Sequence, residues 1–120
     1  MKPYQDARVE GEKLAKQYAE LEKADQVDFY NGLEGYYSVL GHNKKQEAIA
    51  VLIEKNDHKI YVYQLDKGIS QDKAATISRE KGASDIDKVT FGRYQDKPIW
   101  EVKSGNQYYL VDFKTGAVIQ

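Results

Sequence analysis

The 120-residue chain contains no cysteine, so it can form neither a disulfide bond nor a thiolate metal site. Its longest apolar stretch, residues 48–53, is far shorter than the ~20 residues that a membrane-spanning helix needs. Positive and negative charges nearly balance, with 18 Lys and Arg against 19 Asp and Glu. No basic stripe that could neutralise several phosphates is present, which argues against nucleic-acid binding.

Motifs of common catalytic and cofactor sites are also missing from the sequence. It has no Gly-x-x-x-x-Gly-Lys phosphate loop, no Gly-x-Gly-x-x-Gly fingerprint and no Gly-x-Ser-x-Gly nucleophile elbow. His42 and His58 fall in predicted turns, without further ligand residues at metal-like spacing. We therefore expect no metal, no cofactor and no catalytic residue. A catalytic pair of carboxylates, as in glycosidases, remains an alternative, although nothing in the sequence favours one.

The sequence does contain one pattern twice. Residues 25–29 (Asp-Gln-Val-Asp-Phe) match residues 87–91 (Asp-Lys-Val-Thr-Phe) at a shift of 62, and residues 49–60 match residues 108–119 at a shift of 59. A period of this size predicts two copies of one supersecondary unit. Because a unit of ~60 residues buries little surface, we expect the copies to pack on each other or to share a sheet.

The first copy reads as a helix followed by strands. From about residue 6 to residue 23, Leu14, Tyr18 and Leu21 fall on one stripe, which predicts a helix lying on a sheet. The hydrophobic period then changes to two, which predicts up to four antiparallel strands. The apolar residues expected to form the first core are Phe29, Tyr37, Val39, Leu52 and Val62.

The second copy repeats this order. Ser70 is a natural N-cap for its helix, and Gly82 follows the predicted helix end. Three strands and a short fourth one at residues 118–119 are expected after it. The predicted fold class is therefore α+β, with two tandem units at residues 1–66 and 67–120, each with one helix packed on an antiparallel sheet of three or four strands. The second core is expected to contain Phe91, Trp100, Val102, Val111 and Phe113.

Ten tyrosines are unusual for a chain of this length. Several lie on predicted strands and must face away from the two cores. Tyrosine is favoured on half-exposed strands, so a purely structural role explains much of this, including filling a contact between the copies. Because tyrosine is also frequent in binding hot spots, we treat the outward-facing ones as candidate partner-binding residues. These are Tyr36, Tyr61, Tyr63, Tyr94 and Tyr108.

Parts of the second copy resemble a PepSY-type repeat. Residues 69–75 (Ile-Ser-Gln-Asp-Lys-Ala-Ala) open a helix, and residues 109–118 form a strand that ends in Asp112 and continues into a Thr115-Gly116 turn. Taken together, residues from about 15 to 119 resemble the YpmB family of Gram-positive bacteria, also called TseB-like cell wall elongation regulators. The match is closer in the second copy than in the first.

This resemblance implies how the protein works. Family members carry one N-terminal transmembrane helix and two cystatin-like or PepSY-like units outside the cell, and no catalytic residues are attached to them. It implies a non-enzymatic, membrane-anchored protein on the extracytoplasmic face of the membrane that binds a penicillin-binding protein of the elongation machinery. We expect the anchor to precede Met1 in the native protein.

Other functions stay open. A PepSY-type modulator or inhibitor of a peptidase is the alternative, although the mostly short and polar turns disfavour it. A small-ligand or wall-polymer binder would need a concave pocket. The sequence leaves the partner, the binding face and the oligomeric state open.

Overall fold

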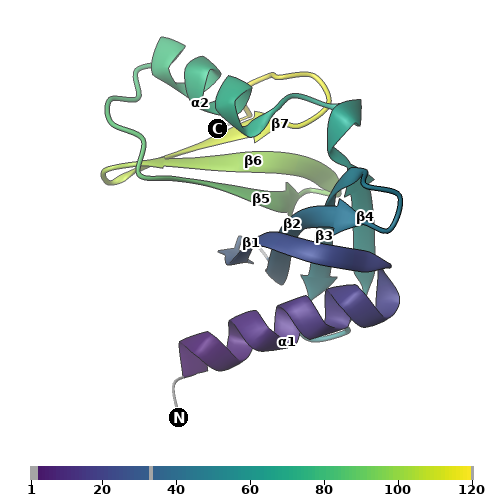
Figure 1. Ribbon diagram of the computed structural model, residues 1–120. Helices are drawn as coiled ribbons and strands as arrows, with labels where there is room; N and C mark the ends of the chain where they lie inside the picture. Colours follow the sequence, from purple (N-terminus) through teal and green to yellow (C-terminus); the bar gives the residue numbers. More distant parts are fainter. Residues whose placement is uncertain (1–2, 33, 120) are drawn as a thin grey trace. The chain divides into compact units, whose positions relative to one another are not determined.

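The computed structural model describes residues 3–32 and 34–119, with side chains described from Val9 onward. The chain divides into two compact units, Met1–Leu65 and Asp66–Gln120. Each unit contains one α-helix and one antiparallel sheet, of four strands in the first and three in the second (Figure 1). The predicted α+β class is confirmed.

The first unit is a helix followed by a meander of strands. In chain order and in spatial order within the sheet, its elements are α1 (Pro3–Tyr18), β1 (Leu21–Asn31), β2 (Gly35–Asn43), β3 (Ala48–Glu54) and β4 (Ile60–Gln64). The predicted helix was too long, because α1 ends at Tyr18 and Leu21 already belongs to β1. Glu20 lies between them with a φ of 57°, a backbone conformation that cannot continue a right-handed helix.

The register of the first sheet shows which face α1 covers. Val27 pairs with Val39, and Val39 pairs with Val51, so these three side chains point to the same face. They form one cluster with Ala15 of α1 and with Ala19 just after the helix end, whose small side chains let the helix lie close to the sheet. This cluster is the core of the first unit.

Three of the five residues predicted for this core are placed differently. Leu52 is buried but pairs with Ser38, so it points to the face opposite α1. Phe29 and Val62 are 38% and 48% exposed, because they lie on the edge strands β1 and β4. Val39 is fully buried and Tyr37 is partly buried against the cluster, as predicted.

A short 3-10 helix, η1 (Leu65–Lys67), spans the boundary between the units. The second unit continues through α2 (Gln71–Glu80), β5 (Lys88–Tyr94), β6 (Lys97–Ser104) and β7 (Gln107–Asp112). Ser70 is the N-cap of α2, and its hydroxyl oxygen accepts a 3.0 Å hydrogen bond from the Lys73 N–H. Gly82 follows the C-cap with a φ of 113°. Both ends of this helix are therefore as predicted. The expected short last strand is present only as a bridge between Val111 and Val118.

The core of the second unit is aromatic. Phe91, Trp100 and Phe113 meet edge to face, with ring centroids 4.9, 5.2 and 6.4 Å apart. Val102 and Val111 are fully buried beside them. All five residues predicted for this core are therefore confirmed as buried.

Candidate protein-binding surfaces

Three of the candidate tyrosines share one face of the first sheet. Tyr36, Tyr61 and Tyr63 point to the side opposite α1, because Tyr61 pairs with Leu52 and that residue faces away from the helix. The rings of Tyr36 and Tyr61 meet edge to face at 6.3 Å. Tyr30 extends this aromatic row, with its ring 6.4 Å from that of Tyr36.

The three tyrosines differ in exposure. Tyr61 and Tyr63 are partly buried, whereas Tyr36 is only 3% exposed. The hydroxyl of Tyr36 donates a 3.2 Å hydrogen bond to Glu34 Oε2. Tyr36 therefore supports the neighbouring rings and has little area of its own to offer a partner.

The other two candidates lie on the second sheet, on the face opposite α2. Tyr94 pairs with Lys97 at one end of β6, and Tyr108 pairs with Lys103 near its other end. Six residues of extended strand separate the two lysines, or ~20 Å. The structure therefore does not bring these tyrosines together. Tyr108 is 53% exposed, and Tyr94 is partly buried.

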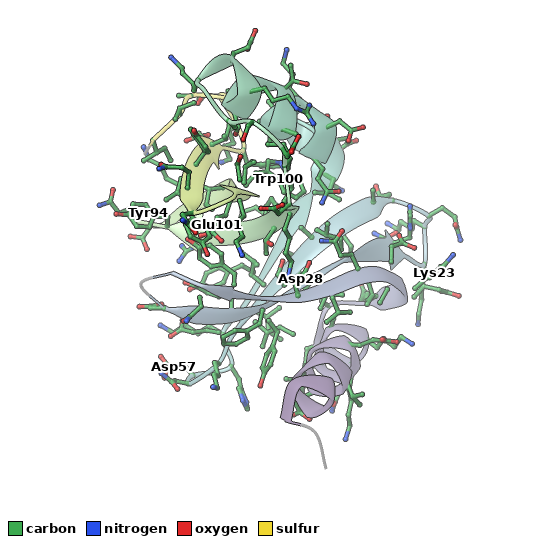
Figure 2. The ribbon with its side chains drawn as sticks, turned by 90° about the vertical axis from the view of Figure 1, so that its left-hand side faces the viewer. Lys23, Asp28, Asp57, Tyr94, Trp100 and Glu101 are labelled. Atoms are coloured by element: carbon green, nitrogen blue, oxygen red, sulfur yellow. The ribbon has the colours of Figure 1, made fainter. Side chains whose placement is uncertain are left out.

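Between these two tyrosines lies a carboxyl group that the sequence did not single out. Glu101 is on the same face, flanked by Thr90 and Leu110 on the neighbouring strands, and Figure 2 labels it with Tyr94. Partial burial raises the pKa of Glu101, and the positive charge of Lys88 lowers it in part. The sequence pattern places Glu101 at an outward position but does not reveal that both neighbours, Thr90 and Leu110, are buried.

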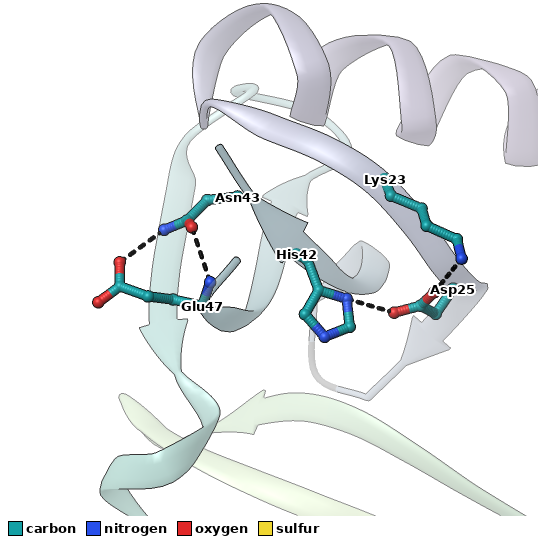
Figure 3. A network of polar contacts seen from close by, with 5 residues as sticks. All are labelled: Lys23, Asp25, His42, Asn43 and Glu47. Atoms are coloured by element: carbon teal, nitrogen blue, oxygen red, sulfur yellow. Dashed lines mark hydrogen bonds and ion pairs between the residues drawn. The ribbon is translucent and has the colours of Figure 1, made fainter. Parts of the chain in front are cut away.

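A polar network holds one end of the first sheet together (Figure 3). His42 Nδ1 lies 2.9 Å from Asp25 Oδ2, and Lys23 Nζ lies 3.9 Å from the other oxygen of that carboxylate. Asn43 donates to Glu47 Oε1 at 2.8 Å and accepts the backbone N–H of the same residue at 3.0 Å. His42 belongs to β2 and not to a turn as predicted. All these groups are partly or largely exposed, so each pair contributes little to stability.

The other end of the sheet is acidic, with Asp57 and Lys23 at opposite ends (Figure 2). Burial raises the pKa of Glu54, and the carboxylates of Glu34 and Asp57 raise it further, while Lys59 lowers it. Among the described residues, no group of His, Asp and Glu is arranged to hold a metal ion. A hydrogen bond with the Asp57 side chain also raises the pKa of Glu54, so these carboxyl groups are crowded together with Lys59 as a neighbouring positive charge.

A shallow apolar depression lies on the helix side of the first unit. It has a volume of about 190 Å³ and is lined by Leu14 and Tyr18 of α1 and by Ile53, His58 and Ile60 of the β3–β4 hairpin. In the part of the chain that the structure describes, neither helix is long and apolar enough to cross a bilayer.

Comparison with known proteins identifies the family. Residues 10–54 match the family described as "Cell wall elongation regulator TseB-like domain". The chain is 38% identical over 114 residues to "Probable cell wall elongation regulator TseB" from Bacillus subtilis (strain 168), covering 88% of this chain and 70% of that protein. The solved structure of the YpmB protein from Bacillus subtilis is similar with a TM-score of 0.78 at 33% identity, covering 100% of this chain and 96% of that one. These matches confirm the resemblance drawn from the sequence: the chain belongs to the TseB-like family of cell wall elongation regulators.

Proposed function

We propose that this chain is the non-enzymatic, extracytoplasmic binding region of a membrane-anchored regulator in a Gram-positive bacterium, and that it binds a penicillin-binding protein of the elongation machinery. The observation that carries the proposal is the 38% identity to a Bacillus subtilis protein named as a cell wall elongation regulator. In this proposal the regulator acts directly on enzymes that build the wall, and it does so outside the membrane.

The surface geometry supports binding of a protein better than catalysis on a small substrate. Small-molecule sites are usually concave, with volumes of about 300–1,000 Å³ and a few convergent polar groups. The depression beside the β3–β4 hairpin is smaller, about 190 Å³, and its lining is mostly apolar. A second depression of about 650 Å³ is lined only by residues of α1 and is wide open to solvent, so no second element encloses a small ligand there. The tyrosine faces are built on sheets, and tyrosine is enriched among residues that dominate protein interfaces.

We further propose that the two units are tandem copies of one cystatin-like or PepSY-like module, residues 1–66 and 67–120. On the first two strands of each unit, residues matched by the sequence repeat pair in the same way, with residues 37–39 matched to residues 100–102. In the first unit Val27 pairs with Val39 and Phe29 with Tyr37. Their counterparts in the second unit form the pairs Val89–Val102 and Phe91–Trp100. The third strand is offset by one residue: Val51 pairs with Val39, but its counterpart Leu110 pairs with Glu101 and not with Val102.

The contact residues in this proposal are the candidate tyrosines. Tyr61 and Tyr63 on the first unit and Tyr94 and Tyr108 on the second would each place an aromatic ring against the partner, with Tyr36 supporting the first pair. Lys97 and Lys103 beside the second pair would add charge at the rim of the contact.

A pull-down experiment tests this function. The purified 120-residue chain is immobilised, detergent-solubilised membranes of the source bacterium are passed over it, and the eluate is labelled with a fluorescent penicillin. We expect at least one labelled band that a heat-denatured sample of the chain does not retain. No labelled band, from cells in which the full-length protein is abundant, would overturn the proposal. The gene upstream of Met1 should encode about 20 apolar residues, which would supply the anchor.

A further inference from the structure

The sheets of the two units present edge strands that could pair with another chain. In the described residues of the second sheet, the β7 edge is occupied and one carbonyl of the β5 edge is capped. On β7, the N–H of Ile119 donates to the Leu110 carbonyl at 2.7 Å, so the C-terminal segment occupies that edge. On β5, the side-chain amide of Gln71 caps the Val89 carbonyl at 2.9 Å. An edge whose backbone groups are already bonded cannot readily accept an added strand.

In the first unit, β1 is shielded by charge and irregularity. Its pairing with β2 has two register shifts, between Leu21 and Lys23 and between Ala24 and Gln26. Such bulges twist an edge away from regular pairing, and charged side chains resist burial there. The charged residues of this strand are Glu22, Lys23, Asp25 and Asp28.

The outer edge of β4 has neither the charged side chains nor the irregular pairing that shield β1. Its sequence, Ile-Tyr-Val-Tyr-Gln, contains no charge, no proline and no bulge. The Glu54 N–H donates to the Lys59 carbonyl, so Glu54 and Lys59 form a hydrogen-bonded pair between the two strands. Since hydrogen-bonded pairs alternate along antiparallel strands, the next ones are Leu52–Tyr61 and Ala50–Tyr63.

The remaining residues of β4 therefore point their backbone groups away from β3. These are Ile60, Val62 and Gln64, and within the described part of the chain no backbone bond occupies their outer side. The same three side chains point to the face that carries α1, where Val62 is 48% exposed. Ile60 also lines the apolar depression beside Tyr18. One short strand thus offers free backbone groups and an apolar surface together.

We propose that the outer edge of β4 is where the partner protein docks, by adding an extended segment of its own as a fifth strand. In this mode main-chain hydrogen bonds give affinity, and alternate side chains give specificity. The inference rests on the proposed function and names the binding mode of the partner.

The charges around the edge define the segment that fits. Its centre is uncharged, and the residues on the α1 side are apolar, because they lie over Val62 and Tyr18. The end beside Gln64 carries a basic residue, since Gln64 donates to the Glu47 carboxylate at 3.4 Å and that carboxylate is exposed. At the other end, Lys59 lies beside the carboxylates of Glu54 and Asp57, so this end specifies no charge on the segment.

The test uses Val62→Pro in the whole 120-residue chain. Proline removes the outward N–H but no bond to β3, so the variant keeps its own sheet while losing a docking donor. Val62→Lys adds a charge at the same place, and Val9→Lys on α1 is the matched control, since Val9 is 67% exposed. Binding is measured by biolayer interferometry against the purified extracytoplasmic domain of the penicillin-binding protein captured in the pull-down. Circular dichroism and thermal melts establish that all variants are folded.

We expect both Val62 variants to weaken binding at least 10-fold and Val9→Lys to change it less than 2-fold. In two-dimensional NMR spectra, the amide signals of Ile60, Val62 and Gln64 should shift on addition of the same domain. Equal binding by folded variants would overturn docking at β4 while leaving the proposed function intact. Failure of the parent chain to capture any penicillin-binding protein would overturn both. Dimerisation of the chain alone, lost in Val62→Pro, would assign this edge to a second copy and overturn the inference.

Discussion

The indole Nε1 of Trp100 donates a 3.0 Å hydrogen bond to the carbonyl oxygen of Ile69, 31 residues earlier in the chain. The N–H of Ile69 in turn donates to the Phe113 carbonyl at 2.8 Å. Ile69 is thus held by Trp100 of β6 and by Phe113, which directly follows β7, immediately before Ser70 caps α2. Trp100 therefore fills the aromatic core and also fixes where the helix begins.

Two substitutions at Trp100 separate these contributions. Trp100→Phe keeps most of the ring but leaves the partly buried Ile69 carbonyl without this donor, at a cost of about 1–3 kcal/mol. Trp100→Ala also opens a cavity and should cost about 3–5 kcal/mol, much of the stability of so small a protein. Urea denaturation followed by circular dichroism measures both. Tyr108→Ala is the control, because an exposed side chain should change the free energy of unfolding by less than about 0.5 kcal/mol. Equal stability of Trp100→Ala and the parent would contradict the core assignment.

Gly41 marks a close approach between β1 and β2. The register shifts of β1 bring the Lys23 carbonyl oxygen over this position, where a Cβ atom would collide with it. We expect Gly41→Ala to lower the free energy of unfolding by about 1–3 kcal/mol through overpacking. Gly105→Asn is the matched control, because Gly105 has a φ of 60° in open space and asparagine tolerates that conformation. A smaller loss at Gly41 than at Gly105 in urea denaturation would show that β1 yields at the bulge.

The second unit could be predicted almost completely from its sequence. Its helix has a side-chain cap at Ser70 and a glycine at its end, and Trp100 and Val102 alternate with Glu101 and Lys103 on a regular strand. Local signals and tertiary packing agree there. Each prediction needed only information from neighbouring residues.

In the first unit, local and tertiary information disagree. Leu21 continues the apolar stripe of α1, yet Glu20 turns the chain with a positive φ that no sequence signal announces. β3 is apolar on both faces, so hydrophobicity alone could not tell that Leu52 points away from the helix. Only the pairing with Ser38 on the neighbouring strand decides it.

For the candidate surfaces, too, the sequence predicted some properties and not others. The alternation of β4 correctly placed Tyr61 and Tyr63 on one face, with Ile60 and Val62 on the other. Exposure could not be predicted, because it depends on distant segments: Tyr36 is buried while Tyr108 is not. Which residues of β4 point their backbone groups outward depends on which cross-strand pairs are hydrogen-bonded. The hydrophobic periodicity of the sequence does not show this.

Glu101 should make stability depend on pH. The folded state raises the pKa of this carboxyl above its ordinary value of 4.5, so the folded chain binds the proton more tightly than the unfolded chain. The ionised group therefore costs stability above the raised pKa, and this cost disappears as the pH falls below the ordinary value. Glu101→Gln should therefore be more stable than the parent near neutral pH. The gain is reduced by the loss of the attraction between Glu101 and Lys88. The difference, measured by urea denaturation across the pH range, should shrink on acidification, and a pH-independent difference would contradict this account.

Tyr108 offers the sharpest test of the tyrosine faces, because it is exposed and contributes little to the core. Tyr108→Ser should leave the free energy of unfolding within about 0.5 kcal/mol of the parent. If the ring is an interface anchor, the variant should bind the captured penicillin-binding protein with a loss of about 1–2 kcal/mol, roughly 5- to 30-fold in Kd. Val9→Ser, which removes an exposed apolar side chain from α1, should change Kd less than 2-fold. Because Tyr108 pairs with Lys103, Lys103→Gln should mainly slow association and reduce its dependence on salt, as charges at the rim of an interface do. Unchanged affinity in Tyr108→Ser would remove this face from the interface and leave Tyr61 and Tyr63 as the aromatic contacts to be tested in the same assay.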